Sequence, residues 1–597
     1  MKTHRLAVAG ILLGAAFAAR QASAQAPTEA PPPPPPPPPE LAPSTQPAVP
    51  PPVLMPAPAV ETKAEEPKEE PIPLAGYRGG GFYLKDEKDN FILYPSGRLQ
   101  VDQYNYFGPG VDETTFKSTL AFKRAQVELA GEFFKNWSFR IEPVLGSNAL
   151  DNASGKAAES FAAAPGAAPT ATSGVYPSAQ TARVVASLGN TFINYRADSL
   201  LNILVGQTQM PFSLEGQSGS KYLPFMEKSL PTRVMGHQVN NGLDMGLLFW
   251  GGTKDKLVTY GIGWANGAGV GRVNTDGRGD FVGRVYTRPL WTMKDVGALK
   301  DLQVGASLSY GSRNPRWTYY DYNSMTTTGG VAFWNPIYTN ATIGRRVHVL
   351  PANTQIAAAA ELRVPFSMFD LTSEFVYVDN GTREAVEGLQ ANDAALTGAG
   401  GQGTLGYGHM HGTGYYVQAG AWLFGPRDIP GLPGTFSMAH LDLKKKTTET
   451  PSALYALVKW EQVSLRYDGY SNSADTTTTG AAATRSNTAN PAQGAYDGDI
   501  KVNALSIGLN YYLTKHLRLT GQWTTYMFPD SAPANWTGAP PDYATAAVCD
   551  AKACANRAAA PAQSLPSAGG TTPVSVLDAR KDGHSLHELL FRAQVAF

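Results

Sequence analysis

The feature that most constrains the fold is a two-residue alternation of apolar and polar side chains, which recurs in segments of about ten to fourteen residues from Tyr77 to Phe597. In the last segment Arg592 and Gln594 share one face, and the other face carries Leu589, Phe591, Ala593, Val595 and Phe597. Successive side chains of a β-strand point to opposite faces. Segments of this length match tilted strands that cross a bilayer. The alternation therefore predicts membrane-spanning strands with one apolar face.

The same pattern can be followed along the chain. Around 503–513 the odd-numbered residues from Leu505 to Leu513 are apolar or aromatic, and Ser506, Gly508 and Asn510 face the other way. No turn residue separates Trp460 from Val463, so 451–470 is expected to be one long strand with a bulge. The expected strands are 94–107, 118–131, 135–146, 183–196, 200–210, 242–251, 256–265, 279–290, 301–313, 353–363, 366–379, 411–424, 451–470, 500–513, 515–528 and 585–597.

The connections between these strands alternate in length. Long ones span 147–182, 211–241, 314–352, 380–410 and 529–584, whereas those at 197–199 and near Thr514 are very short. Long external loops and short periplasmic turns are typical of outer-membrane barrels. The connection 425–450 is long on the periplasmic side, so either that turn is extended or a nearby strand is misplaced. The prediction is an all-β fold, a transmembrane antiparallel β-barrel of about 16 strands.

The segment before the barrel differs in composition. Lys2, His4 and Arg5 precede an apolar stretch and the small residues 22–24, which predicts a signal peptide over 1–24. An uncleaved anchor is the alternative, but the apolar stretch is too short to span a bilayer. Residues 25–75 include nine consecutive prolines, 31–39, and cannot build a core, so we expect a disordered periplasmic linker. It is either a plain tail or a spacer that reaches the cell wall. The barrel domain is then 76–597.

Charge and cysteine content narrow the function classes. The chain has 49 basic and 49 acidic residues, so its formal net charge of zero argues against a nucleic-acid partner. After the signal no apolar run is long enough for a membrane helix. The only cysteines, Cys549 and Cys554, are expected to form one small loop disulfide in an oxidising compartment. A metal site there would need two more ligands.

Catalytic and metal-binding patterns are weak. The sequence contains no Gly-x-Ser-x-Gly motif of the kind that holds a catalytic serine, and its few histidines are scattered. We therefore expect that the protein is not an enzyme and binds no cofactor. His409 and His411 form a pair without an acidic or thiolate third ligand, which is a poor metal signal. We therefore expect no metal.

Basic residues on the predicted lumen faces indicate how the barrel interior is charged. They are Arg98, Arg124, Arg140, Arg284, Arg363, Arg466, Arg518 and Arg592. Arginine presents a fork of donors suited to oxyanions, so such a ladder could attract anions into a pore. Alternatively these side chains pair with acids on the same faces, namely Asp102, Glu128, Glu142, Glu361, Glu374 and Asp468. Modest anion preference and weak selectivity both remain open.

Several motifs in order resemble the phosphate-selective porin O and P family, over about 81–597. Residues 99–102 look like the family's first strand, 122–131 like its arginine-bearing second strand, 205–212 with Glu215 like the strand into its third external loop, and 506–513 like its penultimate hairpin. The terminal Phe597 resembles the signal read by the barrel-assembly machinery. The resemblance implies a sixteen-stranded trimeric channel in outer-membrane lipid.

The resemblance also suggests the solute. Family members named for phosphate bind it through basic side chains in the constriction. Here 211–241 is the natural inward-folding loop, and it offers Lys221, Lys228, Arg233 and His237 against few acids. We therefore expect an outer-membrane porin for passive diffusion of small hydrophilic solutes, with preference for anions such as phosphate. The alternative is a structural barrel tethered to the periplasm or cell wall by its linker, with weak or no selectivity.

Overall fold

The structure is a computed structural model, and the part described below lies in the unit Pro71–Phe597. The described residues are 72–108, 118–147, 184–236, 242–270, 272, 274, 276–314, 322, 325–330, 332–334, 336–340, 345–386, 404–427, 434, 441–445, 451–469, 498–527 and 585–597. The predicted signal peptide, most of the linker, and Cys549 with Cys554 lie outside these residues.

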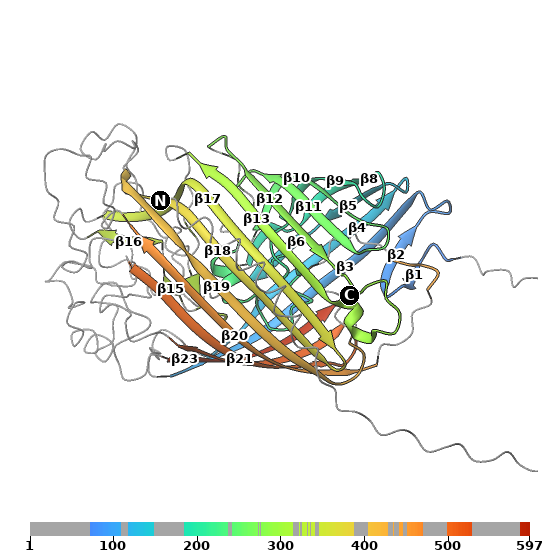
Figure 1. The fold of residues 1–597 in the computed structure, drawn as a ribbon. Helices are drawn as coiled ribbons and strands as arrows, with labels where there is room; N and C mark the ends of the chain where they lie inside the picture. Colours follow the sequence, from blue (N-terminus) through green and yellow to red (C-terminus); the bar gives the residue numbers. More distant parts are fainter. Residues whose placement is uncertain are drawn as a thin grey trace, which may run out of the picture. The chain divides into compact units, whose positions relative to one another are not determined.

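The wall is a closed antiparallel barrel with sixteen strand positions, as predicted (Figure 1). Each strand pairs with the next one around the wall, and β23 closes the ring on β3 over the register Ala596↔Arg98 to His587↔Phe107. Because the ring is closed, no strand is left with an edge of unpaired backbone N–H and C=O groups. A sheet that faces lipid requires this. In order the positions are β3 Phe91–Phe107; β4 Thr119–Phe133; β5 Trp137–Ile141 with β6 Pro143–Ser147; β7 Val184–Leu188 with β8 Thr191–Arg196; β9 Asn202–Gln209; β10 Leu243–Gly252; β11 Val258–Ala265; β12 Asp280–Thr287; β13 Gln303–Arg313; β17 Arg345–Phe366; β18 Phe369–Val386; β19 Thr404–Phe424; β20 Ala453–Asp468; β21 Gly498–Tyr512; β22 Leu517–Met527; and β23 Ser585–Ala596.

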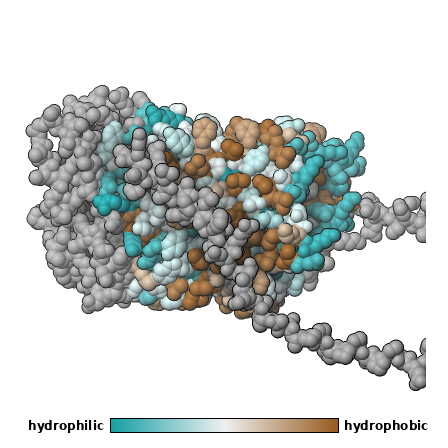
Figure 2. Space-filling view, in the orientation of Figure 1, coloured by the Kyte–Doolittle hydropathy of each residue, from teal (hydrophilic) through white to brown (hydrophobic). Residues whose placement is uncertain are grey.

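The outer face of the wall is apolar. Large side chains such as Phe281, Leu308 and Ile507 are at least half exposed, as expected for residues that face lipid. Figure 2 shows a band of hydrophobic residues around the wall on the visible face, with hydrophilic residues at the end where the turns are short. Among the described residues, no helix is long and apolar enough to cross a membrane. We call the end with the short turns the periplasmic end.

A hairpin at the periplasmic end was missed by the sequence analysis. Strands β1 (Ala75–Arg78) and β2 (Gly81–Lys85) pair with each other, and the end of β2 also pairs antiparallel with the start of β3. Gly79 and Gly80 form its turn with φ of 58° and 91°. Two successive residues with positive φ are the conformation of a tight hairpin turn, and glycine adopts it without strain. The Gly-Gly pair between two short alternating runs was the available signal.

The other small elements belong to the connections. The β9–β10 connection contains the helix α2 (Leu230–Val234). The 3-10 helix η5 (Gly297–Asp301) precedes β13. The β13–β17 connection contains β16 (Ile337–Asn340), which pairs with β17, and a separate hairpin of β14 (Met325–Thr326) with β15 (Ala332–Trp334).

Three details correct or resolve the sequence predictions. Residues 453–468 are one strand, but the bulge lies in its neighbour β19, where the register shifts between Trp422 and Phe424. The long connection after β19 is an extended turn, because β19 and β20 both exist on either side of it. Arg466 was placed in the lumen, but it is exposed on the outer face and pairs with Asp468 at 2.8 Å, because the odd-numbered residues of β20 point inward.

Candidate functional site: a cavity between the wall and an inward-folded loop

The connection from Met210 to Gly236, here called the inner loop, folds into the barrel. Its methionine, leucine, valine and phenylalanine residues are almost fully buried, with Met210, Leu230 and Met235 at 0% exposure. This burial explains why the loop turns inward, since leaving a run this rich in apolar side chains in water costs free energy. Within the loop, Glu215 Oε2 accepts hydrogen bonds from the Ser229 amide at 2.7 Å and the Thr232 hydroxyl at 2.9 Å, which fixes the start of α2.

Side chains from the wall hold the backbone of the inner loop from several sides. Donors and acceptors come from β13, β18, β20, β21 and β22. The bonds join Ser307 Oγ to the Ser213 amide, Glu374 to the Leu214 and Glu215 amides, Glu461 to the Leu230 amide, Asn510 to the Pro224 carbonyl, Arg518 to the Leu223 carbonyl, and Gln522 to the Met226 amide. Because these strands lie around the ring, the loop crosses the lumen and narrows it.

One ion-pair network ties the inner loop to the seam that closes the barrel. Arg592 on β23 donates two bonds of 2.7 Å to Asp102, its cross-strand partner on β3. Glu227 of the loop accepts from Arg592 at 3.0 Å and from both Arg124 Nη atoms at 2.8 Å. Burial alone would raise the pKa of Glu227. The charges of Arg124, Lys123 and Arg592 and the Arg124 hydrogen bond outweigh burial, so that pKa lies well below its usual range.

A cavity of about 870 Å³ lies between the inner loop and the wall strands from β3 to β10. Gly80, Gly81 and Phe82 of the β1–β2 hairpin line its periplasmic side, together with Lys515 and His516 from the turn after β21. Seven lining residues are Lys or Arg, and three are Glu. The basic ones are Arg98, Arg124, Arg140, Lys221, Lys228, Arg233 and Lys515; the acidic ones are Glu128, Glu142 and Glu227. The lining is therefore predominantly cationic.

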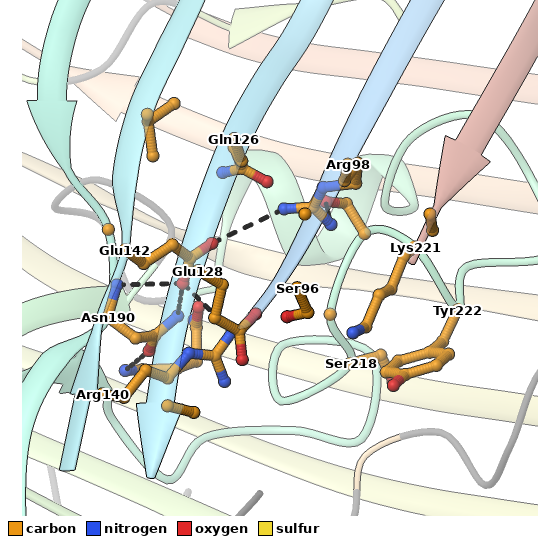
Figure 3. A pocket seen from close by; sticks show the side chains of 18 of the residues that line it. Ser96, Arg98, Gln126, Glu128, Arg140, Glu142, Asn190, Ser218, Lys221 and Tyr222 are labelled. Carbon is orange, nitrogen blue, oxygen red and sulfur yellow. Dashed lines mark hydrogen bonds and ion pairs between the residues drawn. The ribbon is translucent and has the colours of Figure 1, made fainter. Parts of the chain in front are cut away.

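The wall arginines of this cavity are engaged with carboxylates (Figure 3). Arg140 donates to Glu128 at 2.8 Å and to Glu142 at 3.1 Å. Arg98 lies 3.6 Å from Glu142 and donates to the Ser220 hydroxyl at 2.7 Å. Together with the Arg124–Glu227 pair, these contacts use part of the capacity of all three guanidinium groups.

The lysines and the loop arginine differ from the wall arginines. Lys228 donates to the Gly216 carbonyl at 2.9 Å, and Arg233 donates to the carbonyls of Lys228, Thr326 and Thr327. Lys221 lies over the Tyr222 ring at 5.1 Å, and Lys515 donates to the Gly80 carbonyl at 2.7 Å. Among the described residues, none of these four has a carboxylate within ion-pair distance. Their positive charge is thus less compensated than that of the wall arginines.

Burial also changes the protonation of one of these cations. It lowers the pKa of Lys228 to about 8, because removing the ammonium group from water disfavours its charge, although Glu215 acts in the opposite direction. Lys228 therefore titrates closer to neutral pH than an ordinary lysine.

The structure brings together most, but not all, of the basic residues expected from the sequence. Arg98, Arg124, Arg140, Lys221, Lys228 and Arg233 line one cavity. Arg284 is buried and bonded to Glu361 and the Gly434 carbonyl, and Arg518 is buried against the Leu223 carbonyl and Gln594. These last two are outside the cavity lining. Lys515 was missed, because a lysine in a two-strand turn looks like an ordinary exposed charge.

Metal-ligand clusters are not a feature of this part of the chain. Among the described residues, no group of three or more His, Cys, Asp or Glu side chains is placed to hold a metal ion. His409 lies 2.6 Å from Asp379, and its ring centroid is 5.4 Å from that of His411.

The fold and this cavity define the class of the protein: a transmembrane barrel whose lumen is narrowed by an inward-folded loop, as in outer-membrane channels. The model of the family "Phosphate-selective porin O and P" matches residues 96–328, so the resemblance predicted from the sequence is confirmed over that part of the chain. The match includes the first three motifs and the inner loop. The motif at 506–513 and Phe597 lie beyond it. The family's description is that of porins.

Several solved structures are similar to the chain at low sequence identity. The in-vitro folded OmpT of Vibrio cholerae is 9% identical, with 86% of this chain and 99% of that chain covered and a TM-score of 0.40. An anion-selective porin from Comamonas acidovorans is 10% identical, with coverages of 85% and 100% and a TM-score of 0.37. The outer membrane channel DcaP of Acinetobacter baumannii is 10% identical, with coverages of 86% and 99% and a TM-score of 0.38. A search of curated proteins gave no match.

Proposed function

We propose that the protein is a passive diffusion channel for small hydrophilic solutes that favours anions over cations. The observation that carries this proposal is the lining of the cavity beside the inner loop, where seven basic residues face three acidic ones. A low-dielectric wall concentrates the field of such charges at the narrow section of a pore. The cations that have no carboxylate partner among the described residues, above all Lys221 and Lys515, would supply most of that field.

Phosphate is the solute that the family's description suggests, and we propose it as one of the favoured anions. Selective phosphate binding would require several donors that converge at one depth and are free to bind. Permeation also requires that binding stay weak enough for release. A general anion channel and a phosphate-selective channel therefore differ in one measurable respect, namely whether low millimolar phosphate reduces chloride current.

Several cellular features remain part of the proposal. The signal peptide would direct export, Phe597 would be read by the barrel-assembly machinery, and the channel would form a homotrimer in outer-membrane lipid. The linker 25–75 would lie in the periplasm, and its length would let it reach the cell wall.

The decisive test is a reversal potential across a planar bilayer in a potassium chloride gradient. The full-length protein should give a potential of the anion-selective sign. Replacing Lys221, Lys228 and Arg233 together by Gln should move it toward zero. The matched control is Lys501→Gln, which removes a positive charge from an exposed residue of the wall outside the cavity. A cation-selective sign in the unmodified protein would overturn the proposal, and a barrel with no conductance would favour the tether alternative.

A further inference from the structure

Two neighbouring interruptions of the wall direct one carboxylate into the cavity. Glu142 lies in the one-residue gap between β5 and β6, and Gly189 and Asn190 lie in the gap between β7 and β8. The Gly189 amide donates to the Glu142 carbonyl at 2.7 Å, so the two gaps lie opposite each other. Interruptions of a strand ladder change the direction in which a side chain points. Here they bring the Glu142 carboxylate to the cavity lining (Figure 3).

The Glu142 carboxylate is surrounded by cationic and amide donors. Its Oε2 atom accepts hydrogen bonds from Arg140 Nη2 at 3.1 Å, from the Asn190 amide at 3.2 Å and from Asn190 Nδ2 at 2.9 Å. Its Oε1 atom lies 3.6 Å from Arg98 Nη2. Guanidinium groups and backbone amides are donors that proteins use to hold oxyanions. The carboxylate of Glu142 therefore fills an oxyanion site that belongs to the wall of the cavity.

The wall is built closely around this carboxylate, and its donors are in excess. Glu142 is 4% exposed. A Cβ atom added at Gly189 would lie 2.9 Å from Glu142 Cδ, so a larger residue there would push the carboxylate away. Arg98 Nε and Arg140 Nε are buried without a hydrogen-bond partner among the described residues. The two guanidinium groups thus offer more donors than one carboxylate uses.

Glu128, the neighbouring carboxylate of the same lining, lacks such a site. It accepts a hydrogen bond from Arg140 at 2.8 Å, which is its only hydrogen-bond partner among the described residues, and its side chain is 14% exposed. Removing Glu128 would delete the same charge from the same cavity without emptying a site of several donors. Glu128 therefore provides a matched control for Glu142.

We propose that Glu142 limits the anion affinity of this channel, because it occupies the oxyanion site of Arg98, Arg140 and Asn190 in place of a solute. The inference rests on the proposed anion channel and identifies the residue that keeps its anion binding weak. A carboxylate attached to the wall competes at a high effective concentration. A solute anion reaches these donors only by displacing it, so the anion is held briefly, as conduction requires.

The test asks whether acetate binds where the carboxylate of Glu142 has been removed. Glu142→Ala deletes the part of the side chain that has the size of acetate. In a planar bilayer, acetate should halve the chloride current of this full-length variant at a concentration at least tenfold lower than in the unmodified protein, which is about the contribution of one charge-assisted hydrogen bond. Glu142→Gln keeps the site filled, and Glu128→Ala removes only charge, so both should change the acetate sensitivity by about threefold or less.

A refolding measurement decides the question if Glu142→Ala folds poorly. The substitution leaves Asn190 and both guanidinium groups without this acceptor, so the yield of heat-modifiable barrel in detergent should fall. Acetate that binds the emptied site stabilises the folded state. At ten times its dissociation constant, acetate should raise the ratio of folded to unfolded barrel about tenfold. Chloride at the same ionic strength should not do so, and neither should acetate with Glu128→Ala.

These readouts separate the inference from the proposed function. If acetate neither inhibited nor rescued Glu142→Ala more than Glu128→Ala, the inference would be wrong, whatever the reversal potential of the unmodified protein. A cation-selective potential would overturn the anion channel. Inhibition or rescue by acetate that is specific to Glu142→Ala would support the assignment of Glu142 as the occupant of an oxyanion site.

Discussion

Replacing Glu227 by Gln tests whether an ion pair keeps the inner loop docked on the barrel seam. The change removes a charge that accepts two bonds of 2.8 Å from Arg124 and one of 3.0 Å from Arg592. Arg592 keeps both of its bonds to Asp102, so the pairing of β23 with β3 should survive and the barrel should still assemble. We therefore expect an effect on the loop and on the charge of the cavity, with the wall unchanged.

The size of the effect follows from the surroundings of the pair. Removing one partner of a fully buried pair costs about 3–5 kcal/mol. The side chains of Glu227 and Arg124 are 12% and 21% exposed, so some solvent screening applies, and Gln can still accept a hydrogen bond. We expect a loss of about 2 kcal/mol in loop docking, which is about a thirtyfold shift toward undocked loops. Anion preference should rise, because the cavity loses a negative charge.

Single-channel recording measures both consequences. Glu227→Gln should increase the open-channel current noise and shift the reversal potential further in the anion-selective direction. The matched control is Glu128→Gln, which removes a lining carboxylate that pairs with Arg140 and belongs to the wall. It should shift the potential without adding noise. If the two variants gave the same noise as the unmodified protein, the docking role of Glu227 would be refuted.

Four further predictions address protonation, assembly and the linker. Because the pKa of Lys228 is lowered to about 8, its charge is present below that pH and lost above it, so anion preference should fall between about pH 7 and 9, and Lys228→Arg should abolish this dependence in reversal potentials. Phe597→Asp should block outer-membrane insertion, measured as heat-modifiable barrel at the surface, and normal surface levels would contradict an assembly role. Ile507→Arg, on the lipid face, should destabilise the folded barrel by about 2–4 kcal/mol in denaturant titrations, whereas the same substitution of Lys501 should have little effect. Deletion of 27–70 behind an intact signal should leave barrel folding in detergent unchanged, and failure to fold would mean that this segment contributes to the barrel.

The sequence by itself determined the wall of this protein. A strand whose two faces meet lipid and lumen needs side chains that alternate with period two, so alternation of the kind seen in 505–513 and 589–597 predicted the sixteen strands of the wall and the face on which most of their residues lie. Where alternation is weak, this reasoning failed. Arg466 was assigned to the wrong face near the end of β20, and the β1–β2 hairpin is too short to give a periodic signal.

Only the tertiary structure decided which charges meet. Periodicity places Arg284, Arg518 and Arg98 alike on inner faces, but it carries no information on what faces them across the lumen. The path of the inner loop decides this, since it puts Lys221 and Glu227 in one cavity with Arg98 and Arg124, whereas Arg518 donates to the backbone carbonyl of Leu223 in the same loop. That path depends on contacts between residues several hundred positions apart, such as Glu227 with Arg592. Local sequence can predict that a loop of this composition is buried, but contacts of this range arise only when the barrel has closed around it.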